Sequence, residues 1–480
     1  MPARRLPTPS VKHLSPLAGI TILGLGPGDT TLLTRQAWEL LQNTAEVYLR
    51  TNQHAAVASF PTGLQVKSFD HLYASNLSPA EITDQIVTQV MNLGHRVQGV
   101  VYGVPGHPYV AEATVAGIIH QAELEGLPVR VVEGLSFLGP VLAALGQDLT
   151  PQVTLVDSQK ITTEHHPTFS PGSPVVVSYL YSRQIAIQVK QVLMGVYPAD
   201  QQVYLLHFSV NRGMEMPANP LLEQTRLAEI DQNPHLGLLT HLYLPPLGEA
   251  ASFEAFQEIV AHLRAPDGCP WDREQTHQSL RSHLLSESYE VLAALDASDP
   301  GMLREELGDL LLQIVLHAQI AVEAGEFTME DVLKGIHTKI VRRHPHVFGD
   351  LEIQDVQGVL RNWEILKASE REINDKKIGL LDGIPLVLPA LVQAQEYQER
   401  ANRVGFNWPE LEHIYTRVIV ELEALRKCND NEARLEKFGD LVFAITSLAC
   451  HFQVDIESAL REANARFRRR VDDLQERARE

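Results

Sequence analysis

The chain has 480 residues, of which 44% are hydrophobic and 21% charged, and its formal net charge is -20 at pH 7. This length predicts about three domains of roughly 150 residues each, with the composition of an ordinary globular protein. The acidic balance argues against a nucleic-acid polymer or an anionic membrane as the main partner. No apolar run approaches the ~18–20 residues that span a bilayer.

Neither end of the chain nor its cysteines suggest export. The N-terminal segment 1–18 is basic and proline-containing and lacks the apolar stretch of a signal peptide, so we expect a short flexible tail. Cys269, Cys428 and Cys450 are widely spaced and form no CxxC pair. This pattern predicts a reducing compartment, without a disulfide framework or a zinc site. A cytoplasmic location follows as the expectation.

From residue 20 onwards the sequence has α/β character. A strand predicted over 20–25 leads into the loop Gly24-x-Gly26-Pro27-Gly28-Asp29, and a helix is predicted over 32–41. In this arrangement a backbone can approach a nucleotide-like ligand closely, because glycine has no Cβ. The loop is not G-x-G-x-x-G, and Pro27 removes a backbone donor, so a dinucleotide fingerprint fits poorly. A tight turn that needs positive φ is the alternative.

Two more junctions of this kind follow. A strand over 97–103 runs into Val104-Pro105-Gly106-His107-Pro108, and a strand from Val129 runs into Glu133-Gly134-Leu135-Ser136-Phe137. Three such loops at strand C-termini predict one ligand crevice at the end of a mostly parallel sheet. Later strands, at 173–179, 202–208 and 238–244, predict a second α/β layer.

In their order and spacing, these loops resemble the S-adenosylmethionine loops of the tetrapyrrole (corrin/porphyrin) methylase family, over about 19–247. The resemblance implies a cofactor cleft between two α/β domains. It differs at His107, where porphyrinogen methylases usually carry Asp, which leaves the methyl acceptor open. The residues it implies for binding S-adenosylmethionine are Gly24, Gly26, Pro27, Gly28, Asp29, Gly106, His107, Pro108 and Ser136.

After residue 252 helices replace strands, with helices predicted over 253–263, 276–296, 302–324 and 328–343. Two of them carry Glu287-x-x-Glu290 and Glu306-x-x-Asp309, and residues three apart share a helix face. The breaker-rich segment 296–301 predicts antiparallel packing, which would bring four carboxylates together. Such a group repels itself unless it holds a cation, and oxygen ligands suit Mg²⁺. Amphipathic helices with solvated acidic faces are the alternative.

A basic cluster ends the last of these helices, at Lys339, Arg342 and Arg343. Cations are favourable at a helix C-terminus for electrostatic reasons alone. The functional alternative is a phosphate clamp, in which arginine supplies paired donors. Upstream, the loop 264–272 contains Trp271, which we expect to be buried.

The motifs Ser286-Glu287-Ser288-Tyr289-Glu290 and Glu306-Leu307-Gly308-Asp309, with the flanks Cys269-Pro270-Trp271-Asp272 and Arg342-Arg343-His344-Pro345-His346-Val347-Phe348, resemble the MazG family of nucleoside triphosphate pyrophosphohydrolases. One departure is Ser286, where the family usually has its first glutamate. The resemblance implies a Mg²⁺ site and a triphosphate site. Its implied metal ligands are Glu287, Glu290, Glu306 and Asp309, and its implied substrate contacts are Trp271, Lys339, Arg342, Arg343 and Trp363.

The segment 380–480 repeats the helical unit. Glu421-Leu422-Glu423-Ala424 echoes the first acidic motif, and Glu436-Lys437-Phe438-Gly439-Asp440 echoes the second. Ala424 and Lys437 replace two of the four carboxylates, and Lys437 would bring its own positive charge into a cation site. We therefore expect a non-catalytic copy that serves mainly as a dimerisation platform. Arg466, Arg469 and Arg470 align with the first basic cluster and leave nucleotide binding open.

The sequence thus predicts a multidomain protein: a flexible tail (1–18), an α/β methylase-like domain (19–247), a catalytic all-α MazG-like domain (253–375) and a second, degenerate one (380–480). The expected function is Mg²⁺-dependent hydrolysis of nucleoside triphosphates to monophosphate and pyrophosphate, with Lys339, Arg343 and the four carboxylates as catalytic residues. The alternatives are a methyltransferase that the helical region dimerises, and a hydrolase regulated by S-adenosylmethionine. We expect a homodimer or higher homo-oligomer formed through the helical domains.

Overall fold

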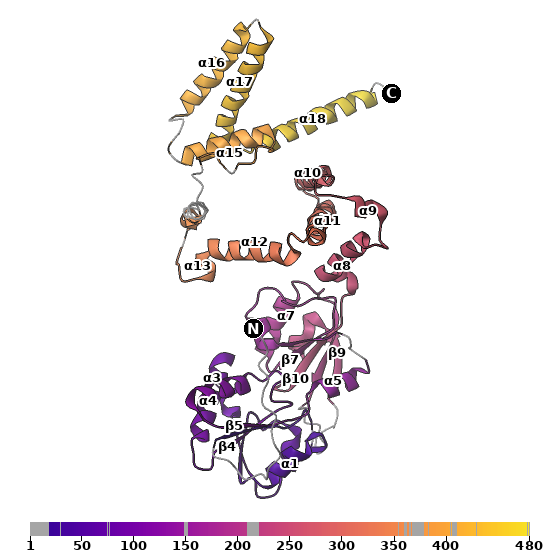
Figure 1. The fold of residues 1–480 in the computed structure, drawn as a ribbon, viewed down its shortest axis with the longest axis vertical. Helices are drawn as coiled ribbons and strands as arrows, with labels where there is room; N and C mark the ends of the chain where they lie inside the picture. Colours follow the sequence, from indigo (N-terminus) through magenta and orange to yellow (C-terminus); the bar gives the residue numbers. More distant parts are fainter. Residues whose placement is uncertain are drawn as a thin grey trace. The chain divides into compact units, whose positions relative to one another are not determined.

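The computed structural model of the chain contains two compact units, residues 1–328 and 329–480, which are described separately (Figure 1). The boundary between them falls inside the predicted catalytic domain. The predicted tail and Asp29 lie outside the described residues, which are 19–28, 30–73, 75, 77–147, 152–208, 220–353, 355–359, 362–363, 366, 379–382, 384–403, 405, 410–428, 430–477 and 479.

The first unit begins with a five-stranded sheet in the order β3-β2-β4-β1-β5, in which all neighbours are parallel. Separate hydrophobic clusters involve α1 (Arg35–Gln42) and the pair α3 (Pro79–Gly94) and α4 (Ala113–Glu125). Parallel sheets are typically covered on both faces in this way, and the central strands β1 and β4 are accordingly buried along their whole length. The strands are β1 (Ile20–Gly24), β2 (Glu46–Leu49), β3 (Gln65–Ser68), β4 (Val100–Val104) and β5 (Val129–Val132).

The strand order places the functional loops together. Because β1 lies between β4 and β5, the C-terminal ends of these three parallel strands are neighbours. Thr34, the N-cap of α1, accepts a hydrogen bond from the Ala37 amide and donates one to the Glu133 carbonyl, at 3.1 Å each. The loops that follow β1 and β5 are therefore linked directly, and the prediction of one crevice is confirmed at the level of topology.

The second sheet has the order β6-β7-β10-β8-β9, with one parallel pair, β6 and β7, and otherwise antiparallel neighbours. Its hydrophobic cluster includes residues of α6 (Ser158–Thr162) and α7 (Arg183–Leu193). The α5 helix (Leu138–Leu145) contributes to a further cluster with this sheet. The strands are β6 (Thr154–Asp157), β7 (Val175–Ser178), β8 (Gln202–His207), β9 (Leu221–Arg226) and β10 (Thr240–Leu244).

The helical part of the first unit consists of α8 (Phe253–Arg264), α9 (Pro270–Glu274), α10 (Arg281–Ala297) and α11 (Pro300–Ala324). The turn between α10 and α11 confirms the predicted hairpin. Ser298 ends α10 in the left-handed region, at φ 53°, and Asp299 caps α11 by accepting from the Gly301 and Met302 amides. Pro300 occupies the first turn, where its missing N–H costs nothing.

Helix α11 is longer and more apolar than we expected. By length and composition it is apolar enough to cross a membrane, so the expectation that no apolar run approaches that length is wrong here. It carries Glu306 and Asp309, and it contacts both α8 and α10. Arg264 of α8 pairs with Glu323 of α11 at 2.7 Å. Only part of its apolar surface is buried, at Val315, Leu316, Ala318 and Ala321, and the rest is partly or fully exposed in this structure.

The second unit repeats this arrangement. Its helices α16 (Leu411–Lys427) and α17 (Asn431–His451) form a hairpin, with Asp430 capping α17 as Asp299 caps α11. Helix α15 (Ala390–Arg403) packs on α17, where the Gln398 side chain donates to the Phe443 carbonyl at 2.8 Å. The unit also contains α12 (Met329–Arg343), α13 (Pro345–Phe348) and α18 (Ile456–Arg477).

Candidate active site and cofactor cleft

Three of the four predicted metal ligands converge at the α10–α11 hairpin. Glu287 comes from α10, while Glu306 and Asp309 lie one turn apart on α11. One carboxylate oxygen from each lies within 4.8 Å of the other two. Glu306 is only 9% exposed, so the cluster sits against the helix interface. The antiparallel packing predicted from the turn thus brings the two acidic motifs together.

This group of carboxylates carries uncompensated negative charge. Burial, followed by the charges of Glu290 and Asp309, raises the pKa of Glu287 and of Glu306 above the ordinary value of 4.5. A raised carboxyl pKa means that the charged form is disfavoured where it stands. Clustered oxygen donors with unfavourable charge fit a hard divalent cation such as Mg²⁺, which would relieve that repulsion.

The fourth predicted ligand, Glu290, is held differently. Its carboxylate accepts a hydrogen bond from the Ser286 hydroxyl at 2.9 Å. Both residues are exposed, and they are one turn apart on α10. Ser286, the residue that departs from the family motif, therefore restrains Glu290 instead of adding another charge to the cluster. Sequence comparison identified the departure but not this contact.

Trp271 is 56% exposed on the short helix α9, so the expectation that it is buried is wrong. A helix of five residues has little surface to cover a large ring. Trp271 instead contacts His283 edge-on, with ring centroids 6.2 Å apart and an interplanar angle of 81°. His283 is one turn before Glu287 and is among the groups that influence the Glu287 pKa, by lowering it. His283 was not predicted as a site residue, although it lies four residues before Glu287 in the sequence.

The predicted substrate cations belong to α12, in the second unit. Lys339 and Arg342 are exposed. The Arg343 guanidinium lies over the Trp363 ring, 5.3 Å from its centroid, so two predicted substrate residues are in contact with each other. Their roles, and those of Lys339 and Arg342, remain predictions.

In the α16–α17 hairpin a lysine occupies the centre of the corresponding acidic group. The Lys437 ammonium lies 2.8 Å from Asp440 and 3.8 Å from Glu421. Arg417 also pairs with Glu421, at 2.8 Å. These cations neutralise the two carboxylates that remain in this copy. The prediction that Lys437 brings its own charge into the cation position is confirmed.

At the C-terminal ends of β1, β4 and β5 the three loops meet backbone to backbone. The Gly26 amide donates to the Gly106 carbonyl at 3.2 Å, and the Gly106 amide donates to the Gly26 carbonyl at 2.8 Å. A Cβ at Gly24 would lie 2.4 Å from the Gly134 nitrogen, and one at Gly134 would lie 2.3 Å from the Gly106 oxygen. Only glycine permits so close an approach.

A pocket opens beside this junction. It is lined by the predicted residues Pro27 and Gly106 and by Pro105 and Phe137 of the predicted loops. Five further lining residues were not predicted from the sequence: His54, Tyr179, Phe208, Leu239 and His241. Its lining is mostly aromatic and apolar and adjoins glycine backbone, which is the kind of surface that small-molecule sites use.

Two histidines of this pocket are neutral. Burial lowers the pKa of His54 to about 4, and its Nε2 is 2.7 Å from the Gly26 carbonyl, to which it donates. Burial likewise lowers the pKa of His241 to about 3. The His241 ring stacks on Phe137, with centroids 4.2 Å apart. Neutral rings of this kind are suited to stacking and hydrogen bonding without adding charge.

The other predicted cofactor residues have local roles in the loops. Nδ1 of His107 accepts from the Tyr109 amide at 3.1 Å, as a carboxylate does in an Asx turn. The Ser136 hydroxyl accepts from the Leu138 amide at 3.2 Å, at the start of α5. Pro108 lies against Gly24, and Gly28 lies in the loop after β1.

Comparisons with known proteins agree with a division of the chain into an α/β domain and a helical region. The sequence model of the Tetrapyrrole (Corrin/Porphyrin) Methylases matches residues 19–207, and that of the MazG nucleotide pyrophosphohydrolase domain matches residues 275–348. The fold and the acidic hairpin therefore define a methylase-type α/β domain fused to a MazG-type helical region. The chain belongs to the family of the Bacillus subtilis protein named Uncharacterized protein YabN. The two are 36% identical over 475 residues, which cover 96% of this chain and 94% of that one.

The helical half has separate relatives. The Thermotoga maritima nucleoside triphosphate pyrophosphohydrolase/pyrophosphatase MazG is 44% identical over 224 residues, covering 47% of this chain and 86% of that protein. The Escherichia coli K12 nucleoside triphosphate pyrophosphohydrolase is 42% identical over 223 residues, covering 45% and 84%. Among solved structures, the cobalt precorrin-4 methyltransferase CbiF matches with 15% identity and a TM-score of 0.32, covering 48% of this chain and 95% of that one.

Proposed function

We propose that the chain hydrolyses nucleoside triphosphates to nucleoside monophosphate and pyrophosphate at the α10–α11 hairpin. The observation that carries this proposal is the convergence of Glu287, Glu306 and Asp309 within 4.8 Å, inside the segment that matches the MazG domain. The raised pKa values of Glu287 and Glu306 support it, because they mark a site that favours a cation. The Thermotoga maritima and Escherichia coli relatives carry the corresponding names.

In this proposal Glu287, Glu306 and Asp309, with Glu290 beside them, hold Mg²⁺. When bound, the ion would neutralise triphosphate charge and make a coordinated water more acidic. Glu290 is exposed and held by Ser286, so we assign it to orient the attacking water and accept its proton. Lys339 and Arg343 stay predicted triphosphate contacts on the family resemblance, and arginine suits paired donation to phosphate oxygens.

The decisive experiment compares Glu306→Gln with Glu305→Gln. Both substitutions remove one negative charge from adjacent positions of α11, but Glu306 is 9% exposed within the cluster and Glu305 is exposed. We expect Glu306→Gln to lower kcat/KM at least about 10³-fold, since a lost metal ligand costs several kcal/mol of transition-state stabilisation. Glu305→Gln should stay within about threefold of wild type. The measurement is pyrophosphate release with Mg²⁺, across common and oxidised triphosphates.

Retention of near-wild-type pyrophosphate release by Glu306→Gln would contradict the site assignment. Equal losses in the two variants would show that net charge on α11 matters rather than the cluster. Thermal melting of both variants separates these outcomes from a loss of fold.

We also propose that the loops after β1, β4 and β5 bind S-adenosylmethionine. The backbone junction of Gly26 with Gly106, and the aromatic pocket beside it, support this. When bound, this cofactor supplies an electrophilic methyl group. The chain would contribute Gly106 backbone, the Phe137 and His241 rings and the neutral His54, which keep the pocket uncharged. Whether the domain transfers a methyl group or senses the cofactor is tested by the triphosphatase rate with and without it.

Gly106→Ala and Gly126→Ala form a matched pair for this second site. Both glycines have φ +68°, so alanine strains the backbone equally. Gly106 lines the pocket, whereas Gly126 ends α4 with nothing within 4 Å. We expect calorimetry on the full chain to show at least about tenfold weaker S-adenosylmethionine binding for Gly106→Ala only. Equal effects, or no binding by wild type, would reduce the domain to a scaffold.

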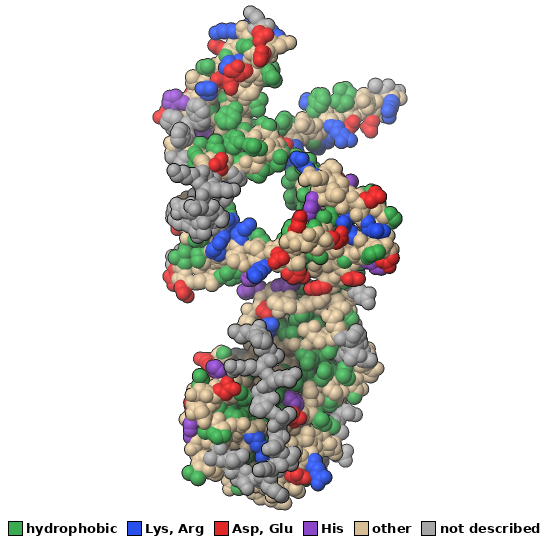
Figure 2. All heavy atoms as spheres, viewed as in Figure 1, with side chains coloured by type: hydrophobic (Ala, Val, Ile, Leu, Met, Phe, Trp, Pro, Cys, Tyr) green, Lys and Arg blue, Asp and Glu red, His purple; other side chains and the backbone are tan. Residues whose placement is uncertain are grey.

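Finally, we propose that the helical region associates with a second copy of the chain. Around the acidic group, α10 and α11 expose apolar side chains, and Figure 2 shows green and red side chains together over these helices. An exposed apolar surface of this kind beside a functional site indicates a protein interface. Light scattering should give at least twice the monomer mass. The side chains concerned are Leu285, Tyr289, Leu292, Leu295, Leu307, Leu311 and Ile314.

A further inference from the structure

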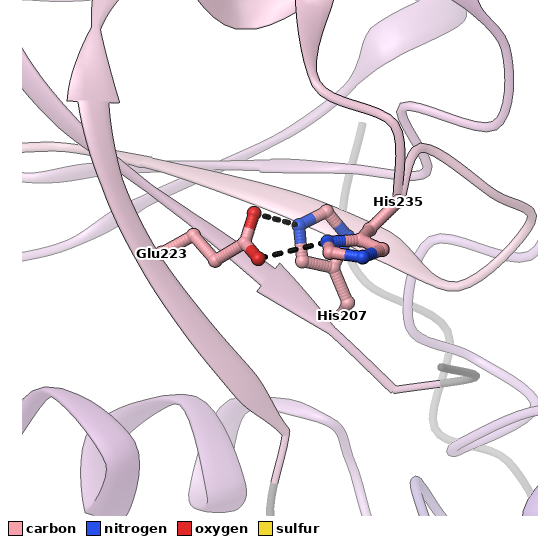
Figure 3. A group of neighbouring side chains, drawn as sticks. All are labelled: His207, Glu223 and His235. Atoms are coloured by element: carbon pink, nitrogen blue, oxygen red, sulfur yellow. Dashed lines mark hydrogen bonds and ion pairs between the residues drawn. The ribbon is translucent and has the colours of Figure 1, made fainter. Parts of the chain in front are cut away.

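A second group of metal-ligating side chains lies in the α/β domain and is not among the residues that line the cofactor pocket (Figure 3). His207 ends β8, Glu223 lies on the neighbouring strand β9, and His235 lies in the segment before β10. One ligand atom from each lies within 4.8 Å of the other two. Nδ1 of His235 is 2.8 Å from one Glu223 oxygen, and Nε2 of His207 is 3.6 Å from the other.

The His207 ring has an unsatisfied nitrogen pointing into this group. The side chain is 1% exposed, and its Nε2 has no hydrogen-bond partner among the residues that the structure describes. Its other nitrogen, Nδ1, lies 3.0 Å from the Thr240 hydroxyl. A buried imidazole nitrogen without a partner is costly. A Glu223 carboxylate oxygen lies 3.6 Å from it, which is too long for a hydrogen bond.

Thr240 determines which nitrogen of His207 is free. The hydroxyl oxygen of Thr240 receives the Gly237 amide at 3.0 Å, and its proton is directed to the His235 carbonyl at 3.4 Å. The oxygen therefore acts as an acceptor for Nδ1–H of His207. Nε2 is left with a lone pair that faces the Glu223 carboxylate. Two acceptors facing each other leave room for a cation between them.

Asn233 holds the other two members in place. Its side-chain NH₂ donates to the Glu223 carboxylate, and its carbonyl oxygen accepts from the His235 amide at 2.8 Å. Metal-binding histidines and carboxylates are commonly oriented by such outer hydrogen bonds. The tautomer of His207 and the orientation of Glu223 are thus both set before any ion binds.

We propose that His207, Glu223 and His235 bind one divalent transition-metal ion of the zinc class. Two imidazoles and one carboxylate are a ligand set that suits Zn²⁺ and leaves a fourth position open. With bonds of about 2.1 Å, a tetrahedral site has ligand-to-ligand edges of about 3.4 Å. The observed separations of 2.8 and 3.6 Å lie on either side of that value. The ion would replace the proton shared by His235 and Glu223.

The earlier expectation of no zinc site rested on cysteine spacing, which says nothing about imidazole ligands. The site would tie β8 and β9 to the segment before β10. Phe208 and His241, the residues that follow His207 and Thr240, line the cofactor pocket. The proposed ion therefore lies beside the pocket wall without being part of it.

The test titrates the metal-stripped full chain with Zn²⁺ by calorimetry, in excess Mg²⁺ to occupy the α10–α11 carboxylates. We expect one equivalent of Zn²⁺ to bind, and His235→Ala and Glu223→Gln each to weaken it at least about 100-fold, since even outer-shell losses cost 10–100-fold. The control is His95→Ala, because His95 also pairs with a glutamate, Glu125, at 2.7 Å but has no second histidine. The His95→Ala variant should bind Zn²⁺ as tightly as wild type does.

His235 has a side chain that is 40% exposed, so its replacement should leave the fold intact, and melting curves without metal check this. Replacing Zn²⁺ with Co²⁺ provides a second readout, because a tetrahedral nitrogen-containing site absorbs strongly in the visible range and an octahedral oxygen site does not. Zn²⁺ binding that survives His235→Ala unchanged would overturn the proposal. So would a wild-type chain that binds no Zn²⁺ in the presence of Mg²⁺.

Discussion

The hairpins α10–α11 and α16–α17 are built on the same plan but differ in what lies between their helices. Each second helix starts at a capping aspartate, Asp299 or Asp430, and each pair carries acidic residues at corresponding positions. In the first pair the carboxylates face one another, and the pKa values of Glu287 and Glu306 are raised. In the second pair Lys437 is bonded to Asp440, and its own pKa is raised.

This difference shows how a repeat can keep its fold while losing a cation site. The positions that shape the turn and the helix contact are retained, because the hairpin depends on them. The positions that create excess negative charge are replaced, and a lysine supplies internally the charge that an ion would bring. A built-in cation needs no ligand to satisfy the carboxylates, which suits a structural role.

The largest effect we expect comes from restoring all four carboxylates of the second hairpin. Ala424→Glu/Lys437→Glu recreates four carboxylates and removes the lysine that pairs with Asp440 and Glu421. In a Glu306→Gln background, which disables the first hairpin, Mn²⁺ titration followed by electron paramagnetic resonance should detect one added ion per chain. Ala424→Glu alone keeps the lysine and should add none. If the double variant gains no ion, Lys437 is not what excludes the cation.

A smaller effect is expected from Ser286, which lies on α10 of the first hairpin. Ser286→Ala removes the hydrogen bond to Glu290, worth about 1 kcal/mol, and should lower pyrophosphate release about 3–10-fold. Ser288→Ala is the control, because the Ser288 hydroxyl bonds to the Leu284 carbonyl of its own helix, at 2.7 Å. Equal rates for the two variants would show that restraint of Glu290 is unimportant.

The smallest effect is a difference between wild type and Glu306→Gln in how the melting temperature depends on pH. Because the folded-state pKa values of Glu287 and Glu306 are raised, their contribution to stability is present below about 4.5 and is lost as pH rises through the raised values. The raised pKa of Lys437 gives a contribution that persists until pH exceeds about 10.5. In EDTA, the melting temperature of wild type should therefore fall relative to Glu306→Gln from about pH 4.5 upward.

Mg²⁺ should remove this difference at neutral pH by binding the ionised carboxylates. A wild-type chain whose melting temperature follows that of Glu306→Gln at every pH in EDTA would show that the repulsion is absent.

Much of the fold was predictable because its signals are local. Strands β1 and β4 are buried and apolar, and β1, β4 and β5 all run into glycine loops. The hairpin is marked by the breakers between α10 and α11. Strands β3, β6 and β9 were not predicted. Each lies at a sheet edge, and β3, Gln65–Ser68, also has a polar sequence. An edge strand is specified by its neighbour more than by its own residues.

The sequence by itself determined the order of the domains, the acidic motifs and the glycine loops, because each is a pattern within a few residues. Only the tertiary structure decided which side chains meet. The pocket wall combines His54, Phe137, Phe208 and His241, and the proposed zinc site combines His207, Glu223 and His235. These residues come together through strand order and register, so no spacing along the chain identifies them. The same holds for Lys437, whose charge matters because packing places it between two carboxylates.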